Sequence, residues 1–229
     1  MTKKLITSAQ LSGQDKGHLT PLCNIPSRWL HTQVHTPFFA LKAAAKQAGF
    51  DLMIASSFRD FERQKQIWNN KFSGAAPILD AQSQPIEIST LSDIEKVDAI
   101  MRWSALPGAS RHHWGTDLDV YAGNMIPDGV SLQLEPWEYQ TGHQAEFSSW
   151  LTEQIDHLGF FLPYHHYQQG VAQEPWHISY FALSEVFIKQ LSLEQLKSTI
   201  LSSNIEGKAT VLSELERLYN QYVTNICHR

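Results

Sequence analysis

The stretch SRHHWGTDLDVY, residues 110–121, sets two histidines and two aspartates on either side of a glycine. Its second half alternates polar and apolar residues as a half-buried β-strand does, which puts Asp117 and Asp119 on one face. Gly115 allows the backbone to bend, so that a side chain before it and one on the strand can converge. The stretch therefore predicts a polar site where a loop enters a strand of the core.

The sequence around this stretch predicts an α+β fold. Helical patterns with suitable residues at their ends occur at 38–48, 61–72, 92–103 and 145–158. Strands are expected at 51–57, 117–121, 159–166 and 174–181, with a turn at Gly170 between the last two. Residues 1–35 are expected to be irregular, and the chain from residue 184 is expected to be helical in three pieces, at 184–190, 192–202 and 209–226. This order predicts a small central antiparallel sheet flanked by helices, with a helical C-terminal extension.

Composition excludes several classes of partner. The chain has 229 residues, of which 42% are hydrophobic and 18% are charged, and its formal net charge is -5, which is ordinary for a globular protein. It has no basic patch of the kind that nucleic acid requires and no Lys/Arg-rich amphipathic stretch for a membrane surface. It also lacks an apolar run of ~18 residues, which a membrane span requires. We therefore expect neither nucleic acid nor membrane among its partners.

The N-terminus and the cysteines favour a cytoplasmic location. After two lysines, only Leu5 and Ile6 form an apolar run, whereas a secretory signal needs roughly 7–15 apolar residues. The two cysteines, Cys23 and Cys227, could form a disulfide in an oxidising compartment. Without a framework pattern, however, they fit a reducing compartment at least as well.

A second stretch, EPWH at residues 174–177, adds two groups that a hydrolytic metal site needs. Zinc prefers about four ligands such as histidine nitrogen and carboxylate oxygen, and a catalytic zinc keeps one position for water. His112, Asp119 and His177 supply two imidazoles and one carboxylate, so we expect them to hold one Zn²⁺ ion. Glu174 is then the candidate general base, which takes a proton from the water and passes it to the leaving amine.

Pro175 sets a condition on this assignment. Proline disfavours the α conformation for the residue before it, so the segment is not expected to be helical. In a regular strand, Glu174 and His177 would face opposite sides. A bend or bulge at Pro175 is therefore required if both side chains are to point into one site.

Three separated blocks of sequence together resemble the M15 family of metallopeptidases. They are SSFRDFERQ at 56–64, S-x-H-x-x-G-x-x-x-D at 110–119, and GVAQEPWHISY at 170–180 with LGFFLPY before it. The resemblance implies a zinc D-alanyl-D-alanine carboxypeptidase or dipeptidase, or an L,D-carboxypeptidase, in a wider group with lysostaphin-type peptidases and hedgehog domains. It covers about residues 38–182. We therefore expect a zinc metallopeptidase domain at 1–183 and a helical extension at 184–229 that packs on it.

The resemblance implies roles for further residues. Arg59 matches the family arginine that engages the substrate, at the scissile carbonyl or at the terminal carboxylate, and a guanidinium is a permanent bidentate partner for such oxygens. Gln64 and Ser110 match positions that line the substrate site. The family pattern has alanine where this chain has Asp117. This aspartate is expected either to support the metal site from behind or to replace Asp119 as a ligand.

Residues beside the motifs have structural explanations of their own. His113 is expected to point away from the metal, and His165 and His166 are expected to lie on an exposed loop. Trp114 and Trp176 are expected to pack in the core. Arg59 has a structural alternative too, because it could pair on the surface with Asp60 or Glu62. We expect it to bind substrate instead.

The leading functional hypothesis is a zinc carboxypeptidase that removes the terminal D-alanine from peptidoglycan stem peptides. A cytoplasmic enzyme would meet wall fragments returned for recycling, which favours L,D-carboxypeptidase activity on the tetrapeptides of muropeptides. The alternatives are D,D-carboxypeptidase or D,D-dipeptidase action on pentapeptide or D-Ala-D-Ala, and a phage-type endolysin that cleaves cross-links. A non-catalytic, metal-stabilised binding module is the non-enzyme alternative. Glu174 argues against it, because a structural zinc needs ligands but no base.

Overall fold

A four-stranded antiparallel sheet lies at the centre of the computed structural model, which describes residues 6–23 and 25–229. Its strands, in their order across the sheet, are β3 (Leu52–Ser56), β6 (Asp117–Ala122), β8 (His177–Tyr180) and β7 (Phe160–Phe161). Every neighbouring pair is antiparallel, which confirms the predicted sheet. Asp119 pairs directly with His177 across β6 and β8, so the register brings the two predicted site stretches side by side.

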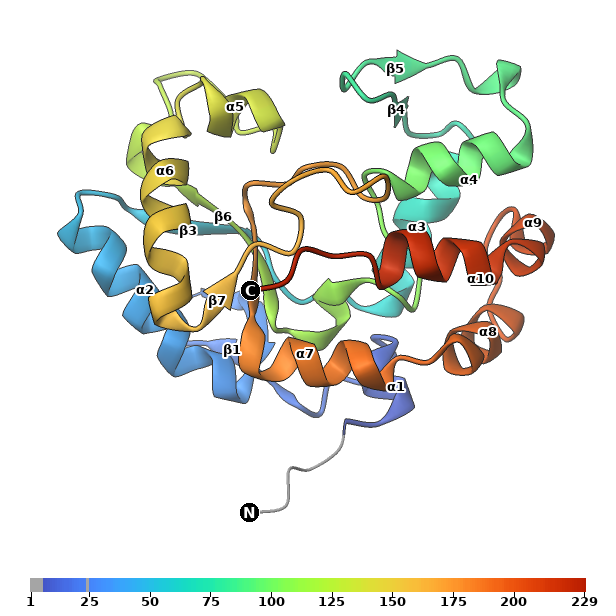
Figure 1. Ribbon diagram of the computed structural model, residues 1–229, viewed down its shortest axis with the longest axis horizontal. Helices are drawn as coiled ribbons and strands as arrows, with labels where there is room; N and C mark the ends of the chain where they lie inside the picture. The colour runs from blue at the N-terminus through green and yellow to red at the C-terminus, as the bar shows by residue number, and fades with distance from the viewer. Residues whose placement is uncertain (1–5, 24) are drawn as a thin grey trace.

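Helices surround this sheet. In Figure 1, α2 (His35–Gln47) and α6 (Ala145–Gln154) lie to its left, and α3 (Phe61–Phe72) and α4 (Asp93–Met101) lie to its right. Two predicted helix starts are confirmed: Asp60 accepts a hydrogen bond from the Arg63 amide at 2.7 Å, and Ser92 forms a capping box with Glu95. The helix predicted from residue 38 begins earlier, at His35. After α6, a 3-10 helix continues to Gly159, whose left-handed conformation (φ 82°) ends it.

Two strands of the sheet are shorter than the predicted 159–166 and 174–181. The chain between them bonds outside the sheet, since the Glu174 amide donates to the Tyr164 carbonyl at 3.0 Å. Residues 162–176 therefore form a loop, in which only turns and bends occur.

The first 35 residues, predicted to be irregular, contain a short helix and a hairpin. These are α1 (Ser8–Leu11) and the antiparallel strands β1 (Leu19–Leu22) and β2 (Ile25–His31). Both contact the predicted site stretch: the Trp114 indole N–H donates to the Leu11 carbonyl at 3.1 Å, and the His31 amide donates to the Gly115 carbonyl at 2.8 Å. The prediction was wrong because it treated Pro21 as a break in the chain's regular structure. Proline is tolerated in a strand where its side of the strand edge is unpaired.

Several short elements complete the chain before its C-terminal part. The strands β4 (Ile78–Leu79) and β5 (Pro85–Ile86) form a small hairpin, and α5 (Pro136–Gln140) precedes α6. Single 3-10 turns are Thr32–Val34, Ile88–Thr90, Arg111–Trp114, Gly123–Met125 and Ile155–Leu158.

The C-terminal extension is helical but more broken than predicted. It consists of α7 (Phe181–Gln190), α8 (Leu193–Leu201), α9 (Lys208–Ser213), α10 (Leu215–Leu218) and a π-helical turn, Tyr219–Val223. The single helix predicted over 209–226 is therefore wrong. The chain breaks at Glu214, and its end leaves the helix so that the Cys227 amide can donate to the Pro163 carbonyl at 2.9 Å. Apolar residues of the extension, such as Leu196 and Leu215, belong to the same hydrophobic core as the sheet.

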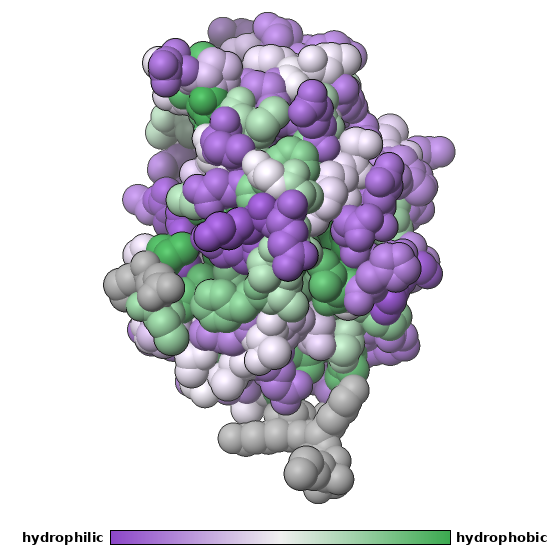
Figure 2. Space-filling model, turned by 90° about the vertical axis from the view of Figure 1, so that its left-hand side faces the viewer, coloured by the Kyte–Doolittle hydropathy of each residue, from purple (hydrophilic) through white to green (hydrophobic). Residues whose placement is uncertain are grey.

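The outer surfaces of the helices are mainly polar. The face over α2 and α6 carries mostly hydrophilic side chains, with a band of hydrophobic ones below its middle (Figure 2). The inner sides of the same helices bury Phe38, Leu41, Phe147 and Leu151, so this is the surface expected of amphipathic helices. Within residues 6–23 and 25–229, no helix combines the length and the apolar character that crossing a membrane would require.

Candidate active site

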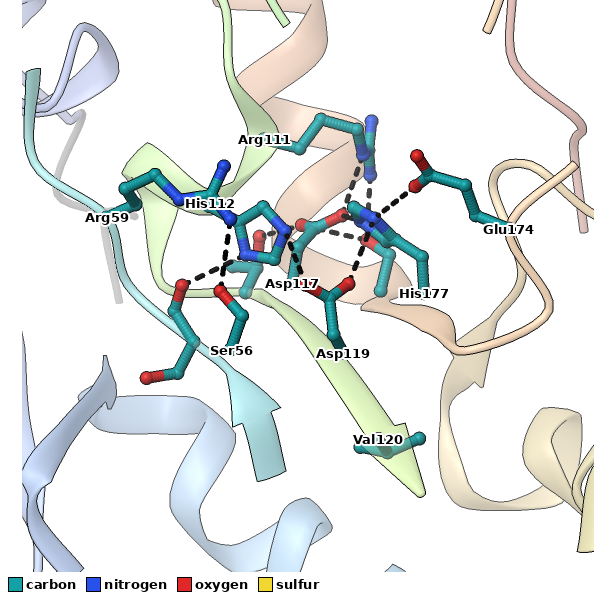
Figure 3. Close-up of polar contacts among 12 residues, drawn as sticks. Ser56, Arg59, Arg111, His112, Asp117, Asp119, Val120, Glu174 and His177 are labelled. Atoms are coloured by element: carbon teal, nitrogen blue, oxygen red, sulfur yellow. Dashed lines mark hydrogen bonds and ion pairs between the residues drawn. The ribbon is translucent and has the colours of Figure 1, made fainter. Parts of the chain in front are cut away.

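The three predicted metal ligands meet in the structure. His112, Asp119 and His177 each offer one ligand atom, and these three atoms lie within 4.8 Å of one another. The Nε2 atom of His112 is 3.3 Å from Asp119 Oδ2, and Nδ1 of His177 is 3.5 Å from Asp119 Oδ1 (Figure 3). All three side chains are buried. Two imidazoles and a carboxylate around one point form a ligand set that suits zinc and leaves a position for water.

Local backbone structure explains why these groups converge. His112 lies on a short 3-10 helix that ends at Gly115 in the left-handed conformation (φ 67°). A Cβ atom at Gly115 would lie 2.7 Å from the His31 backbone nitrogen, so the tight bend requires glycine. The chain then enters β6, where Asp119 sits opposite His177 of β8.

Hydrogen bonds determine which nitrogen of each histidine faces Asp119. The Nδ1 atom of His112 is 2.9 Å from the Ser57 carbonyl oxygen, and Nε2 of His177 is 2.9 Å from Asp117 Oδ1. A carbonyl and a carboxylate can only accept, so each of these nitrogens carries the proton. The atoms that could bind a metal are therefore His112 Nε2 and His177 Nδ1, and outer hydrogen bonds orient both rings, as partners of metal-binding histidines usually do.

Asp117 supports His177 and lies outside the ligand group. Its Oδ1 also accepts from Arg111 Nε at 2.7 Å, and its Oδ2 accepts from the hydroxyls of Thr116 at 2.6 Å and Ser179 at 3.1 Å. Burial alone would raise the pKa of Asp117, but Arg111 and His177 hold this pKa well below its usual range. The carboxylate is thus a fully bonded anion behind the site, which favours the supporting role over that of an alternative ligand.

The acidic surroundings of His177 make the site attractive to a cation. Burial lowers the pKa of an imidazole, but hydrogen bonds with Asp117 and Glu174 and the charge of Asp119 raise the pKa of His177 to about 10. Nδ1 of His177 accordingly donates a proton to Glu174 Oε2, which lies 3.0 Å away. A divalent cation would displace this proton, as metal binding to histidine generally does.

The turn at Pro175 brings Glu174 into the site. Pro175 and Trp176 form a turn in which the His177 amide donates to the Glu174 carbonyl at 3.1 Å. The Glu174 Oε2 atom lies 3.0 Å from His177 Nδ1, so both side chains point inward and the bend required by the sequence is present. A carboxylate beside the metal-facing nitrogen is well placed to take a proton from water.

Arg59 faces the cleft, and the alternative surface pairing is wrong. Its two terminal nitrogens donate to neutral groups, Gln64 Oε1 at 2.9 Å and Ser56 Oγ at 3.1 Å. Asp60 instead caps α3, and Glu62 pairs with a lysine on the same helix. Arg59 therefore carries its positive charge beside the site without an ion-pair partner in the described part of the chain.

A cleft of about 310 Å³ opens over these groups. Its lining includes the predicted residues Arg59, Ser110, His112, Asp119, Glu174 and His177. Gln64 is fully buried behind Arg59 and also donates to the Ala105 carbonyl at 2.6 Å. It therefore positions the arginine rather than lining the cleft.

The neighbouring residues largely behave as their structural explanations predict. His113 points away from the metal ligands, because its Nδ1 donates to the Arg59 carbonyl and its Nε2 accepts from the Gly108 amide. Burial lowers the pKa of His113 to about 3, so it is a neutral structural residue. His165 and His166 are exposed, as expected. Trp114 and Trp176 are packed in the core, and Trp176 also lines the cleft.

Sequence reasoning missed three polar residues of this region, Arg111, Ser179 and Lys71. The first two hold the carboxylate behind the metal ligands, and Lys71 lines the cleft from α3. Ser179 follows His177 by two residues, so strand alternation could have placed both on one face. Lys71 follows Gln64 by seven residues, which is close to two helical turns.

Comparison with known proteins shows which family this chain belongs to and which folds it resembles. The model of a family described as VanY, D-alanyl-D-alanine carboxypeptidase, matches residues 27–183. An uncharacterized protein of Haemophilus influenzae is 42% identical over 121 residues, which cover 52% of this chain and 92% of that protein.

Solved structures with a similar fold include two peptidases. One is a variant of the vancomycin resistance D,D-pentapeptidase VanY in complex with Zn(II), with a TM-score of 0.51 and 25% identity, covering 80% of this chain and 90% of that one. The other is the LdcB LD-carboxypeptidase, with a TM-score of 0.53 and 20% identity, covering 81% of this chain and 80% of that one. The second likeness is one of fold alone.

Proposed function

Since this chain belongs to the VanY family of D-alanyl-D-alanine carboxypeptidases, we propose that it is a zinc carboxypeptidase acting on peptidoglycan stem peptides. The observation that carries the proposal is the group of His112, Asp119 and His177 with Glu174 beside it. The VanY structure at 25% identity contains Zn(II), which supports zinc as the metal. Peptides that end in D-alanine are the proposed substrates.

The donor set of this chain suits the ion. His112 Nε2 and His177 Nδ1 face Asp119 with their other nitrogens already bonded, so two lone pairs and one carboxylate are available. When bound, zinc polarises the scissile carbonyl and lowers the pKa of water.

Two residues of the chain carry the remaining steps. Glu174 accepts the proton of the attacking water and passes it to the leaving amine as the carbon–nitrogen bond breaks. Arg59 stabilises the negative charge that develops on the scissile oxygen, since its guanidinium is held by Gln64 and Ser56 and has no carboxylate partner in the described part of the chain.

Within this class, we propose L,D-carboxypeptidase activity on the tetrapeptides of muropeptides returned to the cytoplasm. Cys23 and Cys227 are unpaired, which supports a reducing compartment. D,D-carboxypeptidase or D,D-dipeptidase activity on pentapeptide or D-Ala-D-Ala is the second candidate. It is favoured by the likeness to a D,D-pentapeptidase, and the same groups would serve either reaction.

Mass spectrometry of products tests both candidates. Zinc-loaded protein is incubated side by side with muropeptides that end in tetrapeptide and in pentapeptide. Loss of one alanine from the tetrapeptide alone is the expected result and means an L,D-carboxypeptidase. Loss from the pentapeptide alone means a D,D-carboxypeptidase and contradicts the finer proposal. If neither peptide nor D-Ala-D-Ala is cleaved while zinc is bound, the carboxypeptidase proposal fails.

A further inference from the structure

Lys71 is a partly buried cation in the cleft, and it has no acidic partner among the residues that the structure describes. It lies in the last turn of α3 and lines the same cleft as Arg59 and Glu174. Its Nζ atom donates to a neutral group, the Ser104 hydroxyl, at 2.7 Å. Across residues 6–23 and 25–229, no carboxylate lies within ion-pair distance of it. A cation that is withdrawn from water without a counter-charge favours an anionic ligand.

Lys71 and Arg59 lie along one wall of the cleft. Gln64, which holds Arg59, precedes Lys71 on α3 by about 10 Å along the helix axis. The segment after α4 runs beside them, because Gln64 Nε2 donates to the Ala105 carbonyl and Lys71 Nζ to the Ser104 hydroxyl. Helical side chains lean toward the N-terminus of their helix, so Lys71 reaches back toward Arg59.

The two cations have different surroundings. Arg59 is close enough to feel the charges of Asp119 and Glu174, whereas Lys71 feels those of Arg59 and Glu174. The Arg59 amide also donates to the His112 carbonyl at 3.1 Å, whereas Lys71 lies in the last turn of α3, so Arg59 is the cation nearer the metal ligands. Burial and the charge of Arg59 lower the pKa of Lys71, so an anion bound beside Lys71 would stabilise its ammonium form.

We propose that Lys71 binds the terminal carboxylate of the substrate peptide and so restricts the enzyme to free C-termini. This assignment rests on the proposed function and adds a recognition residue to it. With the scissile carbonyl held at Arg59 and the metal ligands, the leaving residue extends along α3 and its carboxylate meets the ammonium of Lys71. Ser104, whose hydroxyl accepts from Lys71, can donate its own hydrogen to the same carboxylate.

Binding measurements on zinc-loaded Glu174→Gln protein test this assignment without turnover. Calorimetry compares peptides that differ only in a C-terminal carboxylate or carboxamide. With Lys71 intact, the acid should bind about 10- to 100-fold more tightly than the amide, as for a hydrogen bond between charged groups. Lys71→Met should abolish this preference by weakening binding of the acid alone. Lys71→Arg and Ser104→Ala, which keep the positive charge, should retain the preference.

Three results would overturn the assignment. One is an unchanged preference in Lys71→Met, and another is equal weakening of acid and amide, with zinc content and Tm as in the parent protein. A third is that Lys71→Met loses selectivity for peptides with an acidic side chain but still prefers a C-terminal carboxylate to a carboxamide. That result would mean that Lys71 binds a side-chain carboxylate. Lys71→Gln replaces Lys71→Met if that variant does not fold. Failure of the wild-type enzyme to hydrolyse any peptide would instead refute the proposed function.

Discussion

The two sides of the cleft are built in different ways. The metal end consists of the proposed ligands and base: His112, Asp119, Glu174 and His177. The helical wall consists of lining residues from α3, the segment after α4 and the C-terminal extension: Lys71, Ser104, Tyr222 and Val223. The metal end comes from two short motifs that lead into the adjacent strands β6 and β8, whereas the helical wall joins three separate segments that share no motif. Short sequence motifs thus specify the groups at the metal end, whereas the shape of the cleft around the substrate depends on long-range packing.

The largest effects are expected at the metal end, where one variant should lose hydrolysis but keep zinc and another should lose zinc itself. Glu174→Gln keeps the shape of the side chain but removes the base, so kcat should fall about 10²- to 10⁴-fold while bound zinc is unchanged. His112→Ala removes a ligand, so the zinc content itself should fall. Elemental analysis and a hydrolysis assay on both variants measure the two effects.

Either variant can contradict the roles assigned at the metal end. Hydrolysis at the wild-type rate by Glu174→Gln would mean that another group is the base. Full zinc occupancy in His112→Ala would remove that histidine from the ligand set. A wild-type protein that binds zinc but cleaves no peptide would favour the metal-stabilised binding module.

A smaller effect is expected behind the ligands. Asp117 accepts from His177 Nε2 at 2.9 Å and so keeps Nδ1 turned toward the metal position. Replacing such an outer partner of a metal ligand weakens metal binding about 10- to 100-fold. We expect this loss of zinc affinity for Asp117→Ala, measured by competition with a chelating indicator.

The buried ion pair with Arg111 requires a control for this variant. Asp117→Ala alone leaves a buried cation without a partner, which costs about 3–5 kcal/mol of stability. The double variant Arg111→Met with Asp117→Ala removes both charges, so it should recover much of this stability but keep the weakened zinc affinity. Wild-type zinc affinity in the double variant would show that Asp117 does not orient His177.

The sequence predicted the arrangement at the metal end because short-range rules apply there. Strand alternation puts Asp119 on one face of its strand, and Gly115 permits the bend that carries His112 toward it. The required bend at Pro175 could be stated in advance, since proline and a regular strand both restrict that segment. The helix starts at Asp60 and Ser92 followed from capping patterns in the same way.

The helical wall could not be predicted in the same way. Whether a lysine such as Lys71 faces solvent or a cleft depends on what packs beside its helix, and here that is a segment more than thirty residues later. The continuous helix predicted over 209–226 failed for a similar reason, because tertiary contacts outweigh the helical pattern there. The hairpin in the first 35 residues was also missed, since its strands pair around Pro21.

The smallest expected effect lies beside the helical wall. Arg217 of α10 donates to both carboxylate oxygens of Asp98 on α4, at 2.9 and 3.2 Å, and Asp98 also accepts from the Tyr222 hydroxyl at 3.1 Å. Both charged side chains are 37% exposed, so Arg217→Ala should lower the free energy of unfolding by at most about 1 kcal/mol. Urea unfolding at low and high salt measures this effect, which should shrink as salt increases.

The outcome for Arg217→Ala also shows how far the two sides of the cleft depend on each other. Lys189→Ala is a matched control, because it removes an exposed ion pair within one helix, to Glu185, at 2.6 Å. If the two sides are independent, both variants should bind zinc as the wild type does, and the loss of stability should be larger for Arg217→Ala. If Arg217→Ala also weakened zinc binding, contacts of the C-terminal extension would have to reach the metal ligands. The short motifs alone would then not determine the geometry of the metal end, because that geometry would also depend on the long-range packing that forms the helical wall.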